Sequence, residues 1–262
     1  MNAFASDLDR TLIYSTRSGL GEHPDNCQLV EMYNGKPLSY ISTQTKENLQ
    51  KIMKEMLFIP VTTRTAEQYN RISLFNENEP KYAVVSNGGI ILEDGKPIKE
   101  WSEYIERNSK HSLPLEEMVA LIKQFPIYEE VEKLRFADNL FFYLIFEKEK
   151  AANINTTPIL EWGNRNGWQV SLQGKKLYFI PNAIDKWEAV HYLQKRLSIR
   201  KVISAGDSLL DKNLIEKASY GIAPAHGEIL KHHPFIRSTS SYGMKASEEI
   251  TSTILTDQLI SI

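Results

Sequence analysis

The chain has little of what marks a disulfide-stabilised, membrane-spanning or nucleic-acid-binding protein. Its 262 residues include one cysteine, Cys27, which excludes an internal disulfide framework. Its longest apolar run, Leu140 to Phe146, is far shorter than the roughly 18 residues that span a bilayer. Its 31 Lys and Arg nearly balance 33 Asp and Glu. The net charge of −2 gives no overall attraction to nucleic acid or to an anionic membrane, although it leaves room for a local basic patch.

The sequence also lacks internal repeats, low-complexity stretches and a basic start followed by a long apolar segment. We therefore expect no secretory signal and a cytoplasmic protein, a location with which a lone thiol agrees. Apolar residues make up 42% of the chain and charged residues 24%, as in ordinary globular proteins. The length fits one large domain or two modest ones, with a substantial core.

Short apolar runs alternate with amphipathic segments, and this rhythm predicts an α/β fold. Leu49, Ile52 and Met53, for example, recur at helical spacing behind Ser42, a candidate N-cap. The predicted strands are 2–8, 58–62, 82–86, 177–180, 201–205 and 220–223, and the predicted helices are 43–56, 185–197 and a segment that follows Asp207.

Two regions interrupt the rhythm. The connection 14–42 contains a predicted hairpin, in which 28–33 and 38–41 flank a turn that starts at Asn34-Gly35. We expect this hairpin to form a flap within the core. The stretch 89–176 has helix and strand signals of its own, which predicts an inserted α+β domain. The core is then discontinuous and comprises 1–88 and 177–262.

Two carboxylates follow the first predicted strand, Asp7 and Asp9. In extended backbone their side chains point to the same side. Close carboxylates repel each other unless a cation or a proton lies between them, and Mg²⁺ suits a site made of oxygen ligands. By itself, an Asp-x-Asp pair is also typical of a surface loop with an Asp cap.

Three further strand ends carry polar groups. Thr62 follows the second strand, where a hydroxyl can donate to a phosphate oxygen or cap a helix. Lys186 lies in the first turn of a predicted helix, a position that the helix dipole disfavours for a cation, although surface lysines are common. Asp207 and Asp211 follow Gly206, where an N-cap and a first-turn acid are the simpler interpretation.

The order of these groups carries more weight than any one of them. Ligands of open α/β sheets bind outside the carboxyl ends of the strands. An acid pair, a hydroxyl, a lysine and a second acid pair each follow a predicted strand. Such an order is an improbable coincidence, which favours one shared functional site over four separate structural roles.

The segments around these residues resemble the motifs of the haloacid dehalogenase superfamily. The resemblance is to its Cof-type and sucrose-phosphatase-type members, and it covers the predicted core. It implies a doubly wound parallel sheet with an inserted α+β cap domain. The segments that carry it are FASDLDRTL, VTTR, SNGG at 86–89, YFIPNAIDKWEAVHYL and SAGDSLLDKNLIEKASYGIAPAHGE.

The resemblance implies a role for each matching residue. Asp7 is the nucleophile that forms an aspartyl-phosphate, and Asp9 is the general acid and base. Thr62 holds the phosphoryl group, and Lys186 neutralises its charge. The remaining binding positions implied are Thr63, Arg64 and Asn87 for the substrate.

The resemblance also implies a Mg²⁺ site. Asp7, the backbone carbonyl of Asp9 and Asp207 bind the ion, whereas Asp211 either supports the metal shell or orients Lys186. Three residues depart from the common motifs: Arg10 and Thr63 replace glycines, and Leu210 replaces an asparagine.

The expected function is Mg²⁺-dependent hydrolysis of a small phosphorylated metabolite such as a sugar phosphate. Asp9 argues for a phosphatase, because the dehalogenases of the superfamily lack a carboxylate at that position. A phosphomutase of the phosphomannomutase type shares these motifs, and a non-catalytic partner-binding protein on the same fold stays open as well. We expect neither a nucleic acid nor a membrane as partner, and the sequence is silent on oligomeric state.

Overall fold

The computed structural model describes residues 1–15, 26–76 and 79–256. The chain divides into two compact units. The core unit comprises Met1–Ile98 and Lys186–Ile262, and the insert unit comprises Lys99–Asp185. Within the described ranges, no helix is both long enough and apolar enough to cross a membrane.

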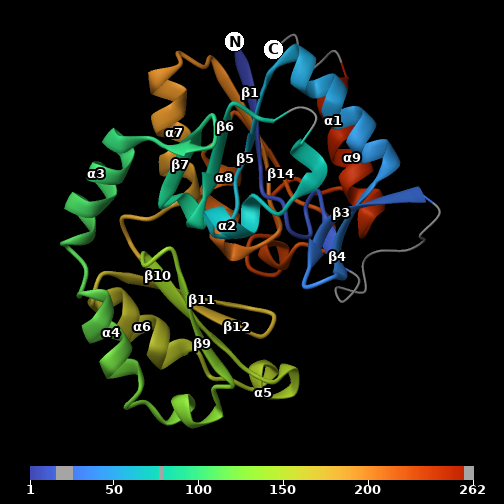
Figure 1. Cartoon of the computed structure of the whole chain (residues 1–262). Coiled ribbons are helices and arrows are strands. Elements are labelled where there is room, and N and C mark those ends of the chain that lie inside the picture. Colours follow the sequence, from blue (N-terminus) through green and yellow to red (C-terminus); the bar gives the residue numbers. More distant parts are fainter. Residues whose placement is uncertain (16–25, 77–78, 257–262) are drawn as a thin grey trace. The chain divides into compact units, whose positions relative to one another are not determined.

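A parallel sheet forms the centre of the core unit, in the order β14-β13-β1-β5 (Figure 1). Phe4 of β1 lies opposite Ile203 of β13 on one side and Phe58 of β5 on the other. A parallel bridge between Val61 and Val84 extends the pairing toward β6. The structure thus confirms the predicted parallel α/β core. These strands are β1 (Asn2–Ser6), β5 (Leu57–Pro60), β6 (Tyr82–Val85), β13 (Lys201–Ala205) and β14 (Tyr220–Ile222).

Helices cover both faces of this sheet (Figure 1). On one face α1 (Thr43–Glu55) packs against α9 (Met244–Leu255), and on the other lie α7 (Lys186–Arg196) and α8 (Lys212–Glu216). The sequence explains where α1 begins, because the side chain of Ser42 accepts a hydrogen bond from Thr45 N at 3.0 Å. Leu49 and Ile52 of α1 then face the sheet as part of its buried core.

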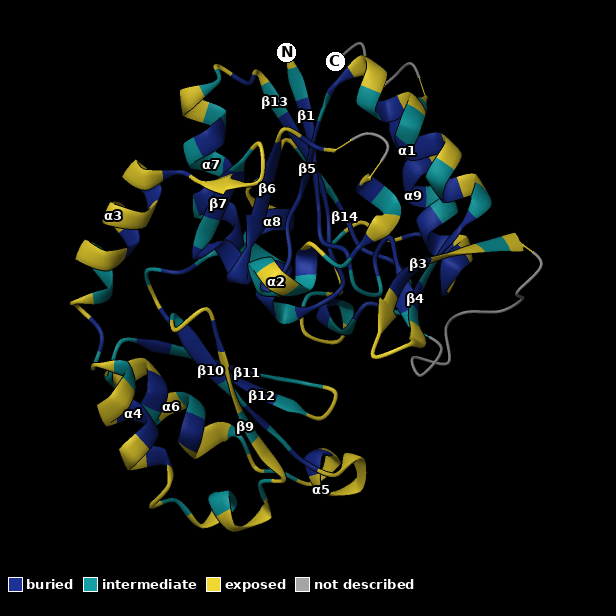
Figure 2. Cartoon of the chain, in the orientation of Figure 1, coloured by how far each residue is buried: buried dark blue, intermediate teal, exposed yellow. Residues whose placement is uncertain are grey.

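A three-stranded antiparallel sheet also belongs to the core unit. β3 (Cys27–Tyr33) and β4 (Lys36–Ser42) form a hairpin, with β2 (Tyr14–Ser15) on the other side of β4. Its turn residues, Asn34 and Gly35, both have positive φ, as a two-residue hairpin turn of this kind requires. The hairpin is exposed at the turn and buried where β4 runs into α1 (Figure 2). The rest of the 14–42 connection, residues 16–25, lies outside the described residues.

The insert unit has an antiparallel sheet in the order β11-β12-β10-β9. Trp168, Phe142 and Phe179 are buried, and the rings of Phe142 and Phe179 stack 4.8 Å apart. A methyl group at Gly163 of α6 would lie 2.4 Å from Val170, so α6 packs closely on β11. The elements are α3 (Lys99–Ser109), α4 (Leu115–Ile122), β9 (Lys133–Ala137), β10 (Phe141–Ile145), α5 (Lys148–Ala152), α6 (Thr157–Arg165), β11 (Trp168–Gln173) and β12 (Lys176–Pro181).

The structure assigns two segments differently from the sequence analysis. The strand at 177–180 was expected in the core, but β12 pairs with β10 and β11 in the insert unit. A short turn at Gly174-Lys175 joins it to β11, and an apolar run looks the same in either sheet. Conversely, β7 (Ile90–Glu93) and β8 (Lys96–Pro97) were expected in the insert, but they extend β6 as an antiparallel sheet of the core unit.

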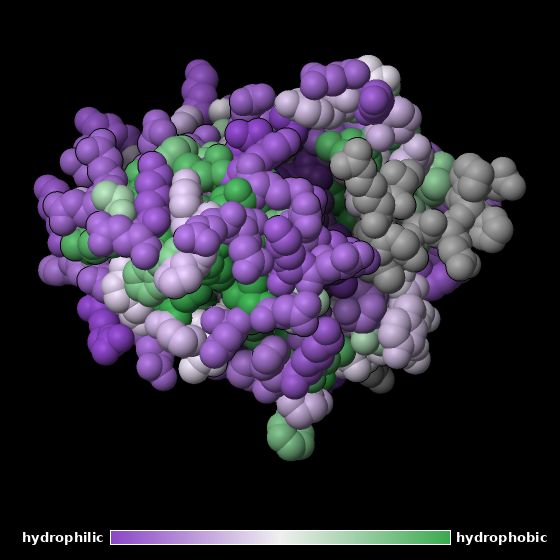
Figure 3. Space-filling model, turned by 90° about the horizontal axis from the view of Figure 1, so that it is seen from below, coloured by the Kyte–Doolittle hydropathy of each residue, from purple (hydrophilic) through white to green (hydrophobic). Residues whose placement is uncertain are grey.

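Hydrophilic side chains cover most of the face shown in Figure 3, with hydrophobic residues gathered in smaller patches between them. Large hydrophobic side chains that are exposed in the insert unit are Tyr104, Leu121 and Phe136. Isolated exposed residues of this kind are normal for a globular surface.

Candidate active site

Asp7 lies directly after β1, at the carboxyl end of the central strand. Its backbone N–H donates to Ala205 O at 2.9 Å, which continues the pairing of β1 with β13. The chain then turns back on itself, and Leu12 and Ile13 both donate to Leu8 O. This turn places the hydroxyl of Thr11 3.1 Å from Asp7 Oδ2. The nucleophile predicted from the sequence is therefore buried, with one carboxylate oxygen bound by its own loop.

Lys186, the first residue of α7, joins the two acid pairs. Its Nζ donates to Asp7 Oδ1 at 2.7 Å and to Asp211 Oδ1 at 2.5 Å. The lysine side chain is only 1% exposed, so it is bound between carboxylates instead of pointing into solvent. These partners explain a cation at a position that the helix dipole disfavours.

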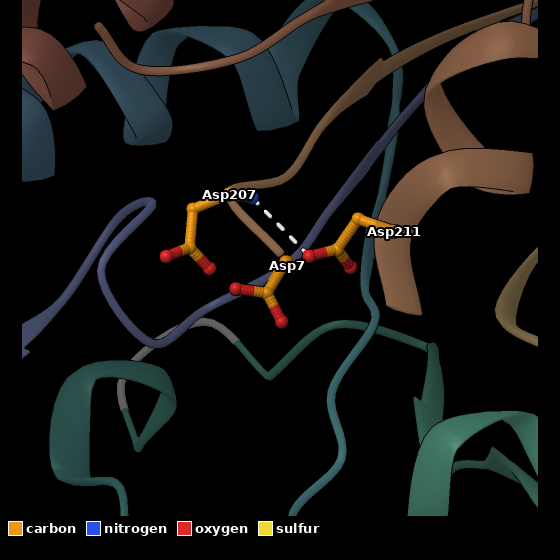
Figure 4. A group of neighbouring side chains, drawn as sticks. All are labelled: Asp7, Asp207 and Asp211. Atoms are coloured by element: carbon orange, nitrogen blue, oxygen red, sulfur yellow. Dashed lines mark hydrogen bonds between the residues drawn. The ribbon is translucent and has the colours of Figure 1, made fainter. Parts of the chain in front are cut away.

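Asp207 and Asp211 come from the loop that follows β13. Asp211 Oδ2 accepts hydrogen bonds from Ser208 N at 2.9 Å, Ser208 Oγ at 2.7 Å and Asp207 N at 3.2 Å. The carboxylates of Asp7, Asp207 and Asp211 gather in one place, as Figure 4 shows. Each offers an oxygen within 4.8 Å of the others, and all three residues are buried.

The charges of this group are not balanced. Burial raises the pKa of Asp7 to about 7, and Asp211 and Asp9 add to the increase, against the attraction of Lys186. Burial, together with Asp7 and Asp211, raises the pKa of Asp207 well above its usual value. Burial alone would lower the pKa of Lys186, but Asp211 and Asp7 raise it. A divalent cation would relieve this excess of negative charge, and a set of carboxylate oxygens fits Mg²⁺.

Thr62 lies at the same edge of the sheet, because Val61 N donates to Ser6 O at 2.8 Å. Thr62 is fully buried, and its hydroxyl accepts from Arg64 N at 3.1 Å, which leaves the hydroxyl proton to donate. Thr63, between them, is half-buried. The Thr62 loop is bound to the loop after β6, since Asn87 N donates to Thr62 O at 2.9 Å.

Asn87 lies in a strained turn. Ser86, Asn87 and Gly88 have φ of 50°, 58° and 99°, a run of left-handed backbone that non-glycine residues rarely adopt. The side chain of Asn87 is 1% exposed, and its Oδ1 has no hydrogen-bond partner among the residues that the structure describes. Its expected role in substrate binding remains a prediction.

Asp9 is separate from the group of three acids. Its carboxylate accepts two hydrogen bonds from Arg64, from Nε at 2.7 Å and from Nη2 at 2.8 Å. The guanidinium of Arg64 contacts Asp9 and also Glu31, with Nη1 2.8 Å from Glu31 Oε2, and its expected role in substrate binding remains a prediction. Sequence reasoning missed Glu31, because one acid in an exposed-looking hairpin carries no signal of its own.

Arg10, at a motif position where relatives have glycine, keeps the backbone that glycine would adopt. Its φ is 63°, in the left-handed region. Its Nε lies 3.0 Å from Asp207 Oδ2. The departure therefore brings a cation to one of the predicted metal ligands. Leu210, at the usual asparagine position, is buried and apolar.

For the phosphatase predicted from the sequence, we expect Gly206→Ala to lower phosphate release at least about 10-fold, because small displacements of groups in a reaction site cost that much or more. A methyl group at Gly206 would lie 2.4 Å from Asp211 Cβ and 2.6 Å from its Cγ, so the Asp211 side chain, which accepts from Lys186, must shift. Phosphate release and urea unfolding check this. Gly174→Ala is the control for destabilisation alone: its φ of 55° strains any side chain, but nothing described lies within 4 Å of its Cβ position, so it should lower stability and leave phosphate release unchanged. Wild-type activity in folded Gly206→Ala would contradict the role given to Asp211.

The family comparison matches nearly the whole chain. The sucrose-6F-phosphate phosphohydrolase family matches residues 2–255. No curated protein is a significant match.

Solved structures with the same fold cover nearly all of the chain. A sucrose-phosphatase from Synechocystis sp. PCC6803, solved with sucrose and phosphate, has a TM-score of 0.68 at 18% identity and covers 96% of this chain and 97% of its own. A putative HAD/COF-like hydrolase from Plasmodium vivax has a TM-score of 0.67 at 11% identity, over 97% and 95% of the two chains. A haloacid dehalogenase-like hydrolase from Bacillus subtilis has a TM-score of 0.55 at 16% identity, over 100% and 91%. These neighbours show a haloacid dehalogenase-like fold, and with the family match they establish that the chain belongs to the sucrose-6F-phosphate phosphohydrolase family.

Proposed function

We propose that the protein hydrolyses a small phosphomonoester, a sugar phosphate or a similar metabolite, with Mg²⁺ and through an aspartyl-phosphate on Asp7. The observation that carries the proposal is the buried contact of Lys186 with Asp7 and Asp211 beside Asp207. A nucleophile, a fixed cation and an all-oxygen metal site then lie together at the edge of the sheet where ligands bind. Membership of a phosphohydrolase family supports it.

Asp7, Asp207 and the backbone carbonyl of Asp9 would hold the metal ion. Asp211 then serves mainly to position other groups, because one of its oxygens accepts from Lys186 and the other from Ser208 and Asp207 N. When bound, Mg²⁺ neutralises charge on the phosphoryl group and orients it.

In the first half-reaction a carboxylate oxygen of Asp7 attacks phosphorus, and the bond from phosphorus to the leaving oxygen breaks. Asp9, in its protonated form, gives its proton to that oxygen, so the alcohol leaves as a neutral molecule. The ammonium of Lys186 and the hydroxyl of Thr62 balance charge on the phosphoryl oxygens. Burial of these groups excludes water and strengthens their attraction.

In the second half-reaction a water molecule attacks phosphorus of the Asp7 phosphate. Asp9, now a carboxylate, takes a proton from that water. The bond between phosphorus and Asp7 breaks, which releases inorganic phosphate and restores the Asp7 carboxylate and the Asp9 proton. Asp9 thus acts as the general acid in the first half-reaction and as the general base in the second.

Arg10→Gly tests the cation that this chain adds to the metal site. We expect Mg²⁺ to bind about fivefold tighter, since an ion pair whose cation is exposed to solvent, as Arg10 is beside Asp207, contributes up to about 1 kcal/mol. Stability should change by less than about 1 kcal/mol, because relief of left-handed strain offsets the lost ion pair. The midpoint of a Mg²⁺ titration, followed by thermal shift, measures the affinity. An unchanged or weaker midpoint would show that Arg10 does not compete for Asp207.

Release of inorganic phosphate from a substrate panel tests the proposed function. The panel holds sugar monophosphates, an aryl phosphate and sucrose-6F-phosphate, which the family description names. We expect release with Mg²⁺ and none with EDTA. Transfer of phosphate between positions of a sugar, without release, would show a phosphomutase instead. If folded protein neither releases nor transfers phosphate, the enzymatic proposal fails.

A further inference from the structure

Glu31 is a buried carboxylate that the proposed reaction does not use. It lies on β3, the edge strand of its sheet, yet its side chain is 0% exposed. Its Oε2 accepts from Ser39 Oγ at 2.8 Å and from Arg64 Nη1 at 2.8 Å, and Arg71 Nε lies 3.4 Å from Oε1. Burial of a charge costs free energy unless the charge is paired in this way. The three partners of Glu31 therefore compensate for the burial of its carboxylate.

The backbone of the hairpin directs Glu31 inward. The register of β3 with β4 shifts on both sides of Glu31, and Val30 and Glu31 are both buried, against the alternation of a regular strand. Such irregularities re-aim a side chain. Residues 72 and 73 hold the β3 backbone at Glu31 on the side away from β4. Glu31 forms an antiparallel bridge with Ile72, and Ser73 Oγ donates to Val30 O at 3.1 Å.

Arg64 connects this carboxylate to the active site. One edge of its guanidinium, Nε and Nη2, donates to both oxygens of Asp9, while Nη1 donates to Glu31. The guanidinium is planar and its donors have fixed directions, so a partner at one corner sets the direction of the others. The Arg64 side chain is 11% exposed, whereas that of Asp9 is 47% exposed. Asp9 is the more exposed partner, and the largely buried Arg64 supports it.

We propose that Glu31 is a positioning residue, which fixes Arg64 so that Arg64 holds the carboxylate of Asp9 in place for proton transfer. The hairpin β3–β4 thereby contributes to catalysis without touching the reacting atoms. This inference rests on the proposed function, in which Asp9 moves the proton in both half-reactions.

The two half-reactions differ in how much they need Asp9, and this difference gives a specific kinetic signature. p-Nitrophenolate leaves readily without a proton, so phosphorylation of Asp7 by p-nitrophenyl phosphate depends little on Asp9. Hydrolysis of the Asp7 phosphate needs the base whatever the substrate was. A displaced Asp9 should therefore let phosphorylated protein accumulate with the aryl substrate, and should slow both halves with a sugar phosphate.

Glu31→Gln tests this inference, with Arg71→Lys as the matched control. Arg71 contacts the same carboxylate but has no contact with Asp9 among the described residues. In Glu31→Gln we expect kcat for a sugar phosphate to fall about 10- to 100-fold with little change in KM. We also expect a burst of p-nitrophenol close to one per protein molecule, and phosphorylated protein in acid-quenched samples by intact mass. Arg71→Lys should behave as wild type in all these measurements.

A purely structural role would give another pattern, because partial unfolding lowers the burst and the steady-state rate together. That pattern, or unchanged kinetics in folded Glu31→Gln, would overturn the inference. If Glu31→Gln does not fold, Arg64→Lys decides by the same readout, since it keeps the charge and loses the paired donors to Asp9. Absence of turnover in the wild type would instead overturn the proposed function, and the inference with it.

Discussion

We expect Asp7→Asn to abolish phosphate release, with a fall in kcat on the order of 10⁴-fold or more. The amide oxygen of asparagine is a poor nucleophile, and no covalent phosphate can form on it. The fold should persist, because β1 and its pairing with β13 involve backbone groups that the substitution leaves unchanged. Phosphate release and circular dichroism measure both effects. Retained turnover in a folded variant would contradict the assignment of Asp7 as the nucleophile.

The same substitution should stabilise the metal-free protein. Burial raises the pKa of Asp7 from 3.8 to about 7, so the native state holds a proton that the unfolded chain releases. The stability associated with this group is fully present at low pH and is lost as pH rises from about 4 through about 7. Above that range, Asp7→Asn with EDTA should exceed wild type by roughly 1–2 kcal/mol in unfolding free energy. Urea unfolding at several pH values measures this, and a less stable variant at high pH would contradict the account.

Removal of metal is the second change with a large expected effect. EDTA should stop turnover, and added Mg²⁺ should restore it, because three buried carboxylates outnumber the two cations beside them, Lys186 and Arg10, and leave negative charge facing the phosphoryl group. Mg²⁺ should also stabilise the fold without substrate, by about 2.7 kcal/mol at a concentration about 100-fold above its Kd. Thermal unfolding with and without Mg²⁺ measures this apart from activity.

Asp207→Asn supplies the control for the metal. Its amide is a weaker ligand than a carboxylate, so most of the Mg²⁺-induced rise in Tm should disappear. Two results would contradict the assignment of the metal site: full turnover of the wild type in EDTA, or a Mg²⁺-induced rise in Tm of Asp207→Asn as large as that of the wild type.

The residues that the sequence predicted best are those at strand ends. Asp7, Lys186 and Asp211 meet because parallel strands end at one edge of the sheet, and a short motif contains that information. The structure also gives the reason for the glycine at 206, since the Asp211 side chain occupies the space that a Cβ would fill.

The sequence could not predict contacts that depend on long-range pairing. Glu31, Arg64 and Asp9 come from three separate segments, and only the folded hairpin brings the first of them inward. The sheet to which β12 belongs was missed for a similar reason. Its apolar residues suit a buried strand in either sheet, and the pairing partner decides between them. The pattern of apolar residues along a segment predicts that a strand or helix exists there. It predicts less securely which other elements that strand or helix packs or pairs with.

The central claim is that phosphate passes through Asp7. The most direct test is to acid-quench the protein during turnover of p-nitrophenyl phosphate with Mg²⁺, and to map bound phosphate by peptide mass. The account predicts phosphate on the peptide that contains Asp7, and none in Asp7→Asn. Continued phosphate release with no phosphorylated peptide, or with phosphate on another residue, would contradict it.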